Sequence, residues 1–296
     1  MRYLIFRISL TALAMLPLRI NHSVGAIIGW LLYIRPNEFK QTAVINLRLC
    51  FPEYDHQQIK TLLRQTLIET GKSFTELGPV WMWPKQRILN KIKKVENLEL
   101  VHDALNQQRG LIILTPHLGC WELNGLYCAD ILPLTSLYRP PRFSSIEKFL
   151  TKARERTGGT LVPTNTTGVK ALYATINRKH VVGILPDQDA GESGVFAPFF
   201  GVNANTVKLI PRLISKTRAP VVMVYAQRLP RGQGYNIHFI KPDENIYSSD
   251  LNIAATAMNH SVEQCIRQNI DQYQWSYKRF KRNVDGKASP YQQPHL

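Results

Sequence analysis

Hydrophobic and polar positions follow two patterns along this chain, one typical of strands and one typical of helices. Short apolar runs bounded by turn residues predict buried strands at residues 111–114, 180–185, 221–228 and 235–240. A Pro/Gly turn joins the last two runs, which is typical of a β-hairpin. Apolar residues at helical spacing predict helices at residues 56–70, 121–130, 146–156, 169–177, 207–216 and 253–270. Because the two kinds of element interleave, we expect an α/β fold with a mixed sheet flanked by helices.

Residues 74–84 are rich in aromatic side chains, and Pro79 and Pro84 are expected to interrupt any helix there. The first 35 residues hold two apolar stretches, residues 8–18 and 24–34. Each stretch is too short to cross a bilayer as a straight helix, which needs roughly 20 residues.

Together the two stretches predict a membrane anchor over residues 1–36, as one broken span or as a shallow helical hairpin. Trp30 and Tyr33 suit an interfacial depth. A hairpin buried in a soluble protein is the alternative. A cleavable signal peptide is disfavoured by the second apolar stretch.

The net charge of the chain indicates what kind of molecule it binds. The 296 residues include 37 Lys and Arg against 21 Asp and Glu, which gives +16. Such a charge indicates nucleic acid, an anionic membrane, or an acidic protein or lipid as the partner. With the apolar N-terminus, it favours the anionic cytoplasmic leaflet of a membrane. The four cysteines lack C-x-x-C spacing and are expected to be reduced thiols.

The candidate chemistry lies just after the strand predicted at residues 111–114, in His117-Leu-Gly-Cys-Trp-Glu122. On one straight helix the two end side chains would point about 140° apart, so a bend at Pro116 and Gly119 is needed to bring them together. A carboxylate on one ring nitrogen fixes the tautomer and supports the imidazolium that forms when the other nitrogen takes a proton. The segment therefore predicts His117 as a general base with Glu122 as its partner. A surface histidine beside a helix-start glutamate is the alternative.

Other chemistry is weakly supported. Cys120 lies inside the His/Glu segment, and we expect it to pack under the following helix rather than to act as a nucleophile. The sequence contains no Walker loop, dinucleotide fingerprint, nucleophile elbow or H-E-x-x-H motif. No metal and no cofactor are indicated.

The His/Glu segment resembles the hallmark of the bacterial lipid A biosynthesis acyltransferases, the late acyltransferases of the lysophospholipid acyltransferase superfamily. In that hallmark an acid follows a histidine after four residues. Further segments are similar to the family in order and spacing, namely residues 46–53, Tyr138-Arg139-Pro140, residues 154–158, Pro186-Asp187-Gln-Asp189 with residues 196–201, and Gln274-Trp275 with residues 278–282. The resemblance covers nearly the whole chain. It implies a glycerolphosphate acyltransferase-like fold, with an N-terminal membrane-anchoring helix ahead of an acyltransferase domain at residues 37–296.

The resemblance also implies an activity. A fatty acyl chain would pass from acyl carrier protein to a hydroxyl of a lipid A precursor of the Kdo-lipid IVA type, in lipopolysaccharide or lipooligosaccharide biosynthesis. The reaction would take place at the cytoplasmic face of the cell inner membrane. The implied partners are acyl carrier protein, an anionic glycolipid acceptor and the membrane, with no cofactor and no nucleic acid.

Four further residues are candidates for substrate binding. Arg139, or backbone N–H groups near Gly119, would stabilise the oxyanion; a structural ion pair is the alternative for Arg139. Arg154 would bind an acceptor phosphate or the His/Glu pair. Asp187 and Asp189 would orient an arginine or sugar hydroxyls, with an Asx-turn as the alternative.

Rival functions are a membrane-bound esterase that uses the same histidine, an acyltransferase for another glycolipid, and a basic nucleic-acid-binding protein. The basic residues at 278–282 are expected to form a solvated face for lipid headgroups or the carrier protein.

Overall fold

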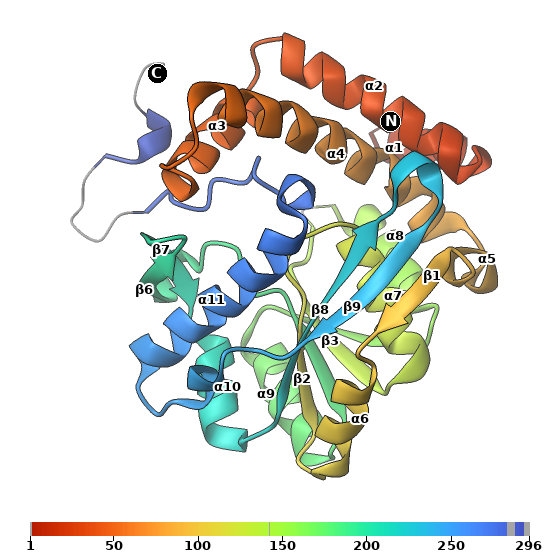
Figure 1. The fold of residues 1–296 in the computed structure, drawn as a ribbon. Coiled ribbons are helices and arrows are strands. Elements are labelled where there is room, and N and C mark those ends of the chain that lie inside the picture. The colour runs from red at the N-terminus through yellow and green to blue at the C-terminus, as the bar shows by residue number, and fades with distance from the viewer. Residues whose placement is uncertain (1, 142, 283–287, 293–296) are drawn as a thin grey trace.

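A mixed sheet forms the centre of the protein. The computed structural model describes residues 2–141, 143–282 and 288–292 (Figure 1). In these ranges one seven-stranded sheet has the order β1–β9–β8–β2–β5–β3–β4. The five strands from β8 to β4 are parallel, β9 runs antiparallel to β8, and β1 is parallel to β9. The predicted α/β class and mixed sheet are confirmed.

The elements have the following bounds. The strands of the sheet are β1 (Ile92–Glu96), β2 (Leu111–Leu114), β3 (Leu134–Tyr138), β4 (Thr160–Pro163), β5 (Val181–Ile184), β8 (Val221–Arg228) and β9 (Tyr235–Ile240). A separate hairpin pairs β6 (Gly194–Phe199) with β7 (Val202–Val207). The helices are α1 (Arg2–Met15), α2 (Leu18–Ile34), α3 (Glu38–Cys50), α4 (His56–Met82), α5 (Lys85–Leu89), α6 (Glu99–Asn106), α7 (Trp121–Ile131), α8 (Ser144–Glu155), α9 (Thr166–Asn177), α10 (Leu209–Thr217) and α11 (Leu251–Gln268).

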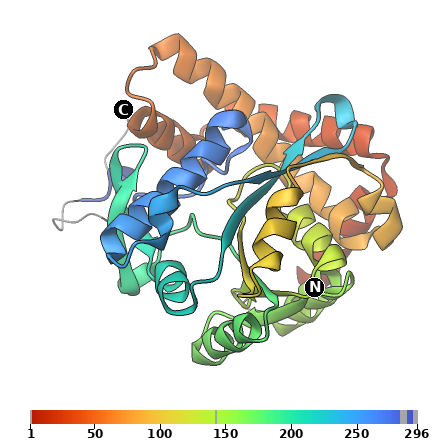
Figure 2. The same cartoon turned by 60° about the horizontal axis from the view of Figure 1, so that its bottom comes forward.

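Helices cover both faces of the sheet and bury one core on each. Successive side chains of a strand point to opposite faces. Met223 and Tyr225 of β8 accordingly lie in the core that α9, α10 and α11 cover. Val222 and Val224 lie in the core that α6, α7 and α8 cover. Figure 2 shows the sheet between these two groups of helices.

The β8–β9 hairpin has the bounds that the sequence predicts, whereas the β6–β7 hairpin was not predicted. Its two-residue loop, Phe200-Gly201, has positive φ at both positions, at 49° and 76°. Two left-handed residues are typical of the tight turn whose twist matches that of the strands. Because the first of them is phenylalanine rather than asparagine or aspartate, the loop lacks the usual sequence signature of such a turn.

Helix α4 continues through Pro79, where the sequence predicted a break. Proline has no N–H, so the carbonyl of Thr75, four residues earlier, loses its helical donor. The side chain of Asn21 on α2 supplies a replacement, because its Nδ2 donates to that carbonyl at 2.9 Å. A residue 54 positions away therefore allows the helix to reach Met82.

The two predicted apolar stretches at the N-terminus form α1 and α2, which pack along α4 (Figure 1). Gly29 of α2 meets α4 so closely that a Cβ there would lie 2.2 Å from the carbonyl oxygen of Leu67. Glycine permits this approach because it carries no side chain. None of the helices in the described ranges is both long enough and apolar enough to cross a membrane. The expected membrane-spanning helix is thus not found there.

Candidate active site

Two neighbouring strands end at the same edge of the sheet and bring His117 and Asp187 together. Strands β2 and β5 are parallel, with Leu114 beside Ile184. His117 and Asp187 each follow three residues after these partners, and each comes directly after a proline. In open α/β sheets this carboxyl edge is where ligands bind.

Asp187 is the hydrogen-bonding partner of His117. The ring Nδ1 of His117 lies 2.8 Å from Asp187 Oδ1, and the backbone N–H of His117 donates to Asp187 Oδ2 at 2.8 Å. Burial alone would raise the pKa of Asp187, but the charge of His117 and these hydrogen bonds outweigh it and hold the pKa below its ordinary value. The carboxylate is therefore ionised and accepts a hydrogen bond from Nδ1–H of the ring. The lone pair that can take a proton is then on Nε2.

This pairing corrects two expectations. Asp187 was expected to orient an arginine or sugar hydroxyls, but its side chain is 1% exposed and is bound to His117. The predicted hydrogen bond from Glu122 to His117 is wrong, because the carboxylate of Glu122 is held by other groups. Arg154 donates to it through Nε at 2.9 Å and through Nη2 at 2.6 Å, and Trp81 Nε1 donates at 2.9 Å.

Glu122 still acts on His117 through its charge. Burial would raise the pKa of Glu122, but Arg154, then Trp81 and the charge of His117, lower it below the ordinary value. The carboxylate is thus ionised near the imidazole. Of the two roles expected for Arg154, contact with the acid of the His/Glu pair is the one that the structure shows.

The predicted bend lies between His117 and α7. Gly119 has φ of +60°, and a Cβ there would lie 1.9 Å from the carbonyl oxygen of Ala226, so only glycine fits. Below the bend, the buried guanidinium of Arg228 donates to the carbonyl of Gly119 at 3.2 Å. Arg228 also pairs with Glu69 at 2.6 Å and Glu76 at 2.5 Å on α4, so α4 and the bend are fixed to each other.

The backbone N–H groups of the bend already have acceptors. Those of Gly119 and Cys120 donate to the carbonyls of Gln272 at 3.0 Å and Ala226 at 2.9 Å, and that of Leu118 donates to Pro116 at 2.7 Å. The N–H groups of residues 118–120 are therefore engaged with protein acceptors. An oxyanion hole at the start of α7 stays a prediction.

Cys120 is buried, as expected. Burial raises the pKa of its thiol well above the ordinary value, which disfavours a thiolate nucleophile. This leaves His117 as the reactive group of the bend.

A cavity of about 920 Å³ opens beside His117. One wall is apolar and includes Leu126, Leu134 and Leu137, and Gly125 also lines it. The polar lining includes Glu122, Arg154 and the exposed Arg139. A cavity with an apolar wall and several convergent polar groups is typical of a small-molecule site.

Asp189 lines the same cavity and contacts two of its basic residues, Lys281 and Arg282. Its carboxylate pairs with Arg282, lies 3.5 Å from Lys281 Nζ, and accepts from the backbone N–H of Gly191 at 3.0 Å. An arginine partner and an Asx-turn, two of the three roles that the sequence left open, are thus present. Contact with sugar hydroxyls stays a prediction. Arg279 was expected on a solvated basic face, but it is 2% exposed and donates to the carbonyl of Asn205.

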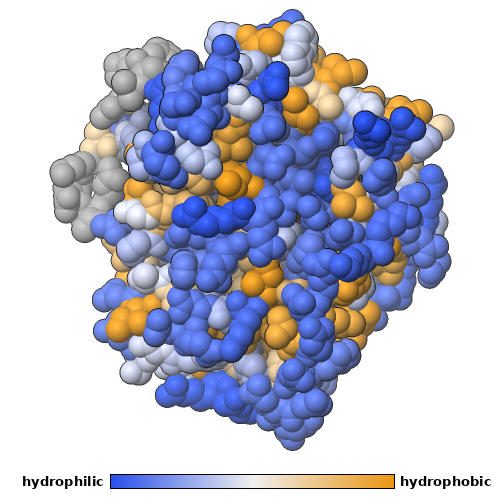
Figure 3. All heavy atoms as spheres, in the orientation of Figure 1, coloured by the Kyte–Doolittle hydropathy of each residue, from blue (hydrophilic) through white to orange (hydrophobic). Residues whose placement is uncertain are grey.

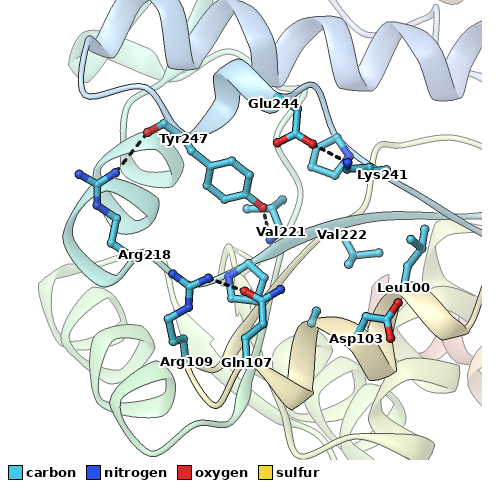
Figure 4. A pocket seen from close by; sticks show the side chains of 13 residues that line it. Leu100, Asp103, Gln107, Arg109, Arg218, Val221, Val222, Lys241, Glu244 and Tyr247 are labelled. Carbon is cyan, nitrogen blue, oxygen red and sulfur yellow. Dashed lines mark hydrogen bonds and ion pairs between the residues drawn. The ribbon is translucent and has the colours of Figure 1, made fainter.

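A second cavity, of about 560 Å³, lies at the other end of the sheet, beside the first residues of β8 (Figure 4). Its basic residues are Arg109, Arg218 and Lys241. Arg109 donates to Gln107, Arg218 donates to the carbonyl of Tyr247, and Lys241 pairs with Glu244, as the dashed lines in Figure 4 show. The described residues that line this cavity include the carboxylates Asp103 and Glu244 but no histidine.

Sequence reasoning missed several residues of the site. The pairing of Asp187 with His117 had a signal, because both residues follow an apolar run and a proline at the same offset. Trp81 and Arg228 had none, since their contacts join segments 41 and 109 residues apart.

The fold and the site are those of an α/β enzyme in which a buried carboxylate holds a half-buried histidine at the carboxyl edge of the sheet. The family model described as bacterial lipid A biosynthesis acyltransferase matches residues 2–282, and the chain belongs to this family. It is 31% identical over 251 residues to the lipid A biosynthesis palmitoleoyltransferase of Escherichia coli, covering 83% of this chain and 80% of the relative. It is 30% identical to the lauroyltransferase of the same organism, with the same shares covered. A lipid A biosynthesis acyltransferase of Haemophilus influenzae is 27% identical over 92% of this chain and 88% of its own.

Proposed function

We propose that this acyltransferase moves a fatty acyl chain from acyl carrier protein to a hydroxyl of a lipid A precursor of the Kdo-lipid IVA type. One observation carries the proposal: His117, oriented by Asp187, faces a cavity with an apolar wall and basic residues. An apolar wall suits a hydrocarbon chain. Arginine and lysine suit the phosphates and acidic sugars of such an acceptor, and an acidic carrier protein.

The reaction would proceed by general-base catalysis. Nε2 of His117 takes the proton of the acceptor hydroxyl, whose oxygen attacks the thioester carbonyl. Asp187 stabilises the imidazolium by a hydrogen bond, and Glu122 adds a second negative charge nearby. The imidazolium then returns the proton to the departing thiolate, so an ester and a free thiol are the products.

This proposal assigns substrate binding to Arg139, Arg154 and Asp189, and to Lys281 and Arg282, which contact Asp189. Arg139, Lys281 and Arg282 line the cavity and would meet the anionic acceptor or the carrier. Arg154 and Asp189 act through the groups they hold, Glu122 and Arg282.

The N-terminal helices support a place at the inner face of a membrane. Helix α2 turns Asn21 and His22 inward, at 0% and 3% exposure, while Arg19 and Ser23 are exposed. Its outer face is apolar and includes Ile27 at 60% and Trp30 at 50% exposure. Figure 3 shows apolar spheres on the upper edge, over α2. An apolar outer face with exposed basic residues suits the interface of an anionic bilayer.

The activity is tested with folded His117→Ala, acyl carrier protein loaded with a fatty acid, and Kdo-lipid IVA. The account expects kcat to fall by about 10²–10⁴-fold, the usual contribution of a general base. The matched control is His102→Ala, which changes an exposed histidine on α6 and should leave kcat unchanged. Mass spectrometry of the product separates acylated precursor from free fatty acid. Near-normal turnover in His117→Ala, or free acid as the main product of the unaltered protein, would overturn the proposal.

Membrane association is tested separately by flotation with vesicles that contain phosphatidylglycerol. The double variant Ile27→Glu, Trp30→Glu should lose most of its vesicle binding. Ile253→Glu, which alters an exposed isoleucine on α11, should keep it. Equal binding by both variants would exclude α2 as the contact.

A further inference from the structure

Gln188 lies at the second nitrogen of the His117 ring. Its Nε2 is 3.1 Å from Nε2 of His117 and 3.4 Å from Oε1 of Gln274. Gln188 directly follows Asp187, so one turn after β5 supplies a partner to each nitrogen of the ring. The Gln188 side chain also lines the cavity beside His117.

The direction of the hydrogen bond follows from the other side of the ring. The Asp187 carboxylate can only accept, so Nδ1 carries the proton and Nε2 presents a lone pair. The carboxamide of Gln188 therefore donates to Nε2, and its second N–H points to Gln274. A neutral amide in this place does not compete with the imidazole for a proton.

Acyl transfer needs a donor for the oxyanion, and the N–H groups of the bend beside His117 already have acceptors. The N–H groups of residues 117–120 donate to Asp187 or to backbone carbonyls. The Nε and Nη2 groups of Arg154 donate to Glu122. The Gln188 carboxamide differs from these, because one of its N–H groups donates to the nitrogen that the substrate hydroxyl must reach.

We propose that Gln188 is a catalytic residue that occupies Nε2 of His117 in the empty site and donates to the oxyanion during acyl transfer, an inference that rests on the proposed function. The entering hydroxyl takes the place of the amide at Nε2. The bond to Gln274 keeps the displaced amide beside the hydroxyl, where the thioester carbonyl must lie for attack. As the oxygen of the acceptor bonds to the carbonyl carbon, the π electrons move to the carbonyl oxygen, and the Gln188 N–H stabilises that charge. Collapse of the intermediate breaks the C–S bond, and the thiolate takes the proton from His117.

The test compares Gln188→Ala and Gln188→Glu with the unaltered protein. For each, kcat and KM are measured for transfer to Kdo-lipid IVA, and the slow hydrolysis of the acyl donor is measured without acceptor. Loss of one oxyanion donor lowers kcat by about 10²–10³-fold. Because water and the acceptor hydroxyl form the same oxyanion, Gln188→Ala should lower hydrolysis and transfer by the same factor, with KM changed less than about threefold.

Gln188→Glu adds an independent readout. A carboxylate at Nε2 stabilises the imidazolium, so the acidic limb of the pH profile of kcat/KM should move to higher pH. The matched control is Gln86→Glu, at an exposed glutamine on α5, which should leave the profile unchanged.

Two results would overturn the assignment while leaving the proposed function intact. One is a kcat of folded Gln188→Ala within about threefold of the unaltered protein while His117→Ala is inactive. The other is a fall in transfer without a fall in hydrolysis, which would make Gln188 a group that positions the acceptor. Activity in His117→Ala would instead remove the proposed function itself.

Discussion

The two ends of the sheet each carry a cavity lined by basic residues, and they differ in what holds those residues. At the carboxyl edge, buried carboxylates hold the functional groups, with Asp187 on His117 and Glu122 on Arg154. At the other end, Lys241 and its partner Glu244 are 71% and 68% exposed, and such surface pairs contribute little. In this protein, the ends of neighbouring strands bring together side chains with well-shielded partners at one cavity and not at the other.

Replacement of Asp187 should cause the largest effect. Asp187 accepts hydrogen bonds from the ring Nδ1 and from the backbone N–H of His117. In Asp187→Asn the side-chain NH₂ group faces one of these two donors, and that donor loses its acceptor. We expect kcat for acyl transfer to fall by about 10²–10⁴-fold. A variant that melts near the temperature of the unaltered protein and retains full kcat would show that Asp187 does not orient the base.

Replacement of Arg228 tests the support beneath the bend. Arg228→Met leaves the buried Glu76 with His22 and Tyr235 as partners and leaves Glu69 with Lys72. The pKa of Glu76 is about 2 despite its burial, chiefly because of Arg228. Loss of one partner of a buried ion pair typically costs about 3–5 kcal/mol. Thermal melting should show a large fall in Tm for this variant and little change for Arg212→Met, which alters an exposed arginine on α10. Equal melting of the two variants would contradict the account.

Replacement of Glu122 should have a smaller effect than that of Asp187. Glu122→Gln removes a negative charge near the imidazolium but leaves the hydrogen bond to Asp187 intact. We expect kcat to fall by about 10- to 100-fold, or about 1.4–2.7 kcal/mol of transition-state stabilisation. If Glu122→Gln reduces kcat more than Asp187→Asn does, the ranking of the two carboxylates is reversed.

The cavity at the other end of the sheet provides the smallest expected effect. The double variant Arg109→Gln, Arg218→Gln should leave kcat and KM for acyl transfer within about twofold, because surface contacts of this kind contribute little energy. A tenfold change in either constant would mean that this cavity takes part in the reaction.

Much of the fold follows from local sequence. Apolar runs next to turn residues locate β2, β8 and β9, and helical spacing locates α7 and α11 within a few residues. Elements that depend on distant contacts were not predicted. The end of α4 requires Asn21 to replace the donor that Pro79 lacks, and β1, which carries the exposed Lys93 and Lys94, is a strand because it pairs with β9 at the edge of the sheet.

The site was predicted in its residue types but not in its pairing. The sequence placed His117 and Asp187 at strand ends, and the structure brings them together at the carboxyl edge. Glu122 and Arg154 line the cavity at the same edge. Proximity along the chain suggested Glu122 as the partner of His117. The register of β2 against β5 instead places Asp187, 70 residues away, at the His117 ring. Glu122 forms its hydrogen bonds with Arg154. Pairing across parallel strands is set by the order of the strands in the sheet, which no local pattern encodes.

The decisive measurement is which nitrogen of the His117 ring carries the proton. Nitrogen NMR of ¹⁵N-histidine-labelled protein, with the His117 signals assigned by comparison with His117→Ala, distinguishes the two neutral tautomers. The account predicts a neutral ring protonated at Nδ1, with the signal altered in Asp187→Asn. A neutral ring protonated at Nε2 would contradict it, because that nitrogen could not then accept a proton from the acceptor hydroxyl.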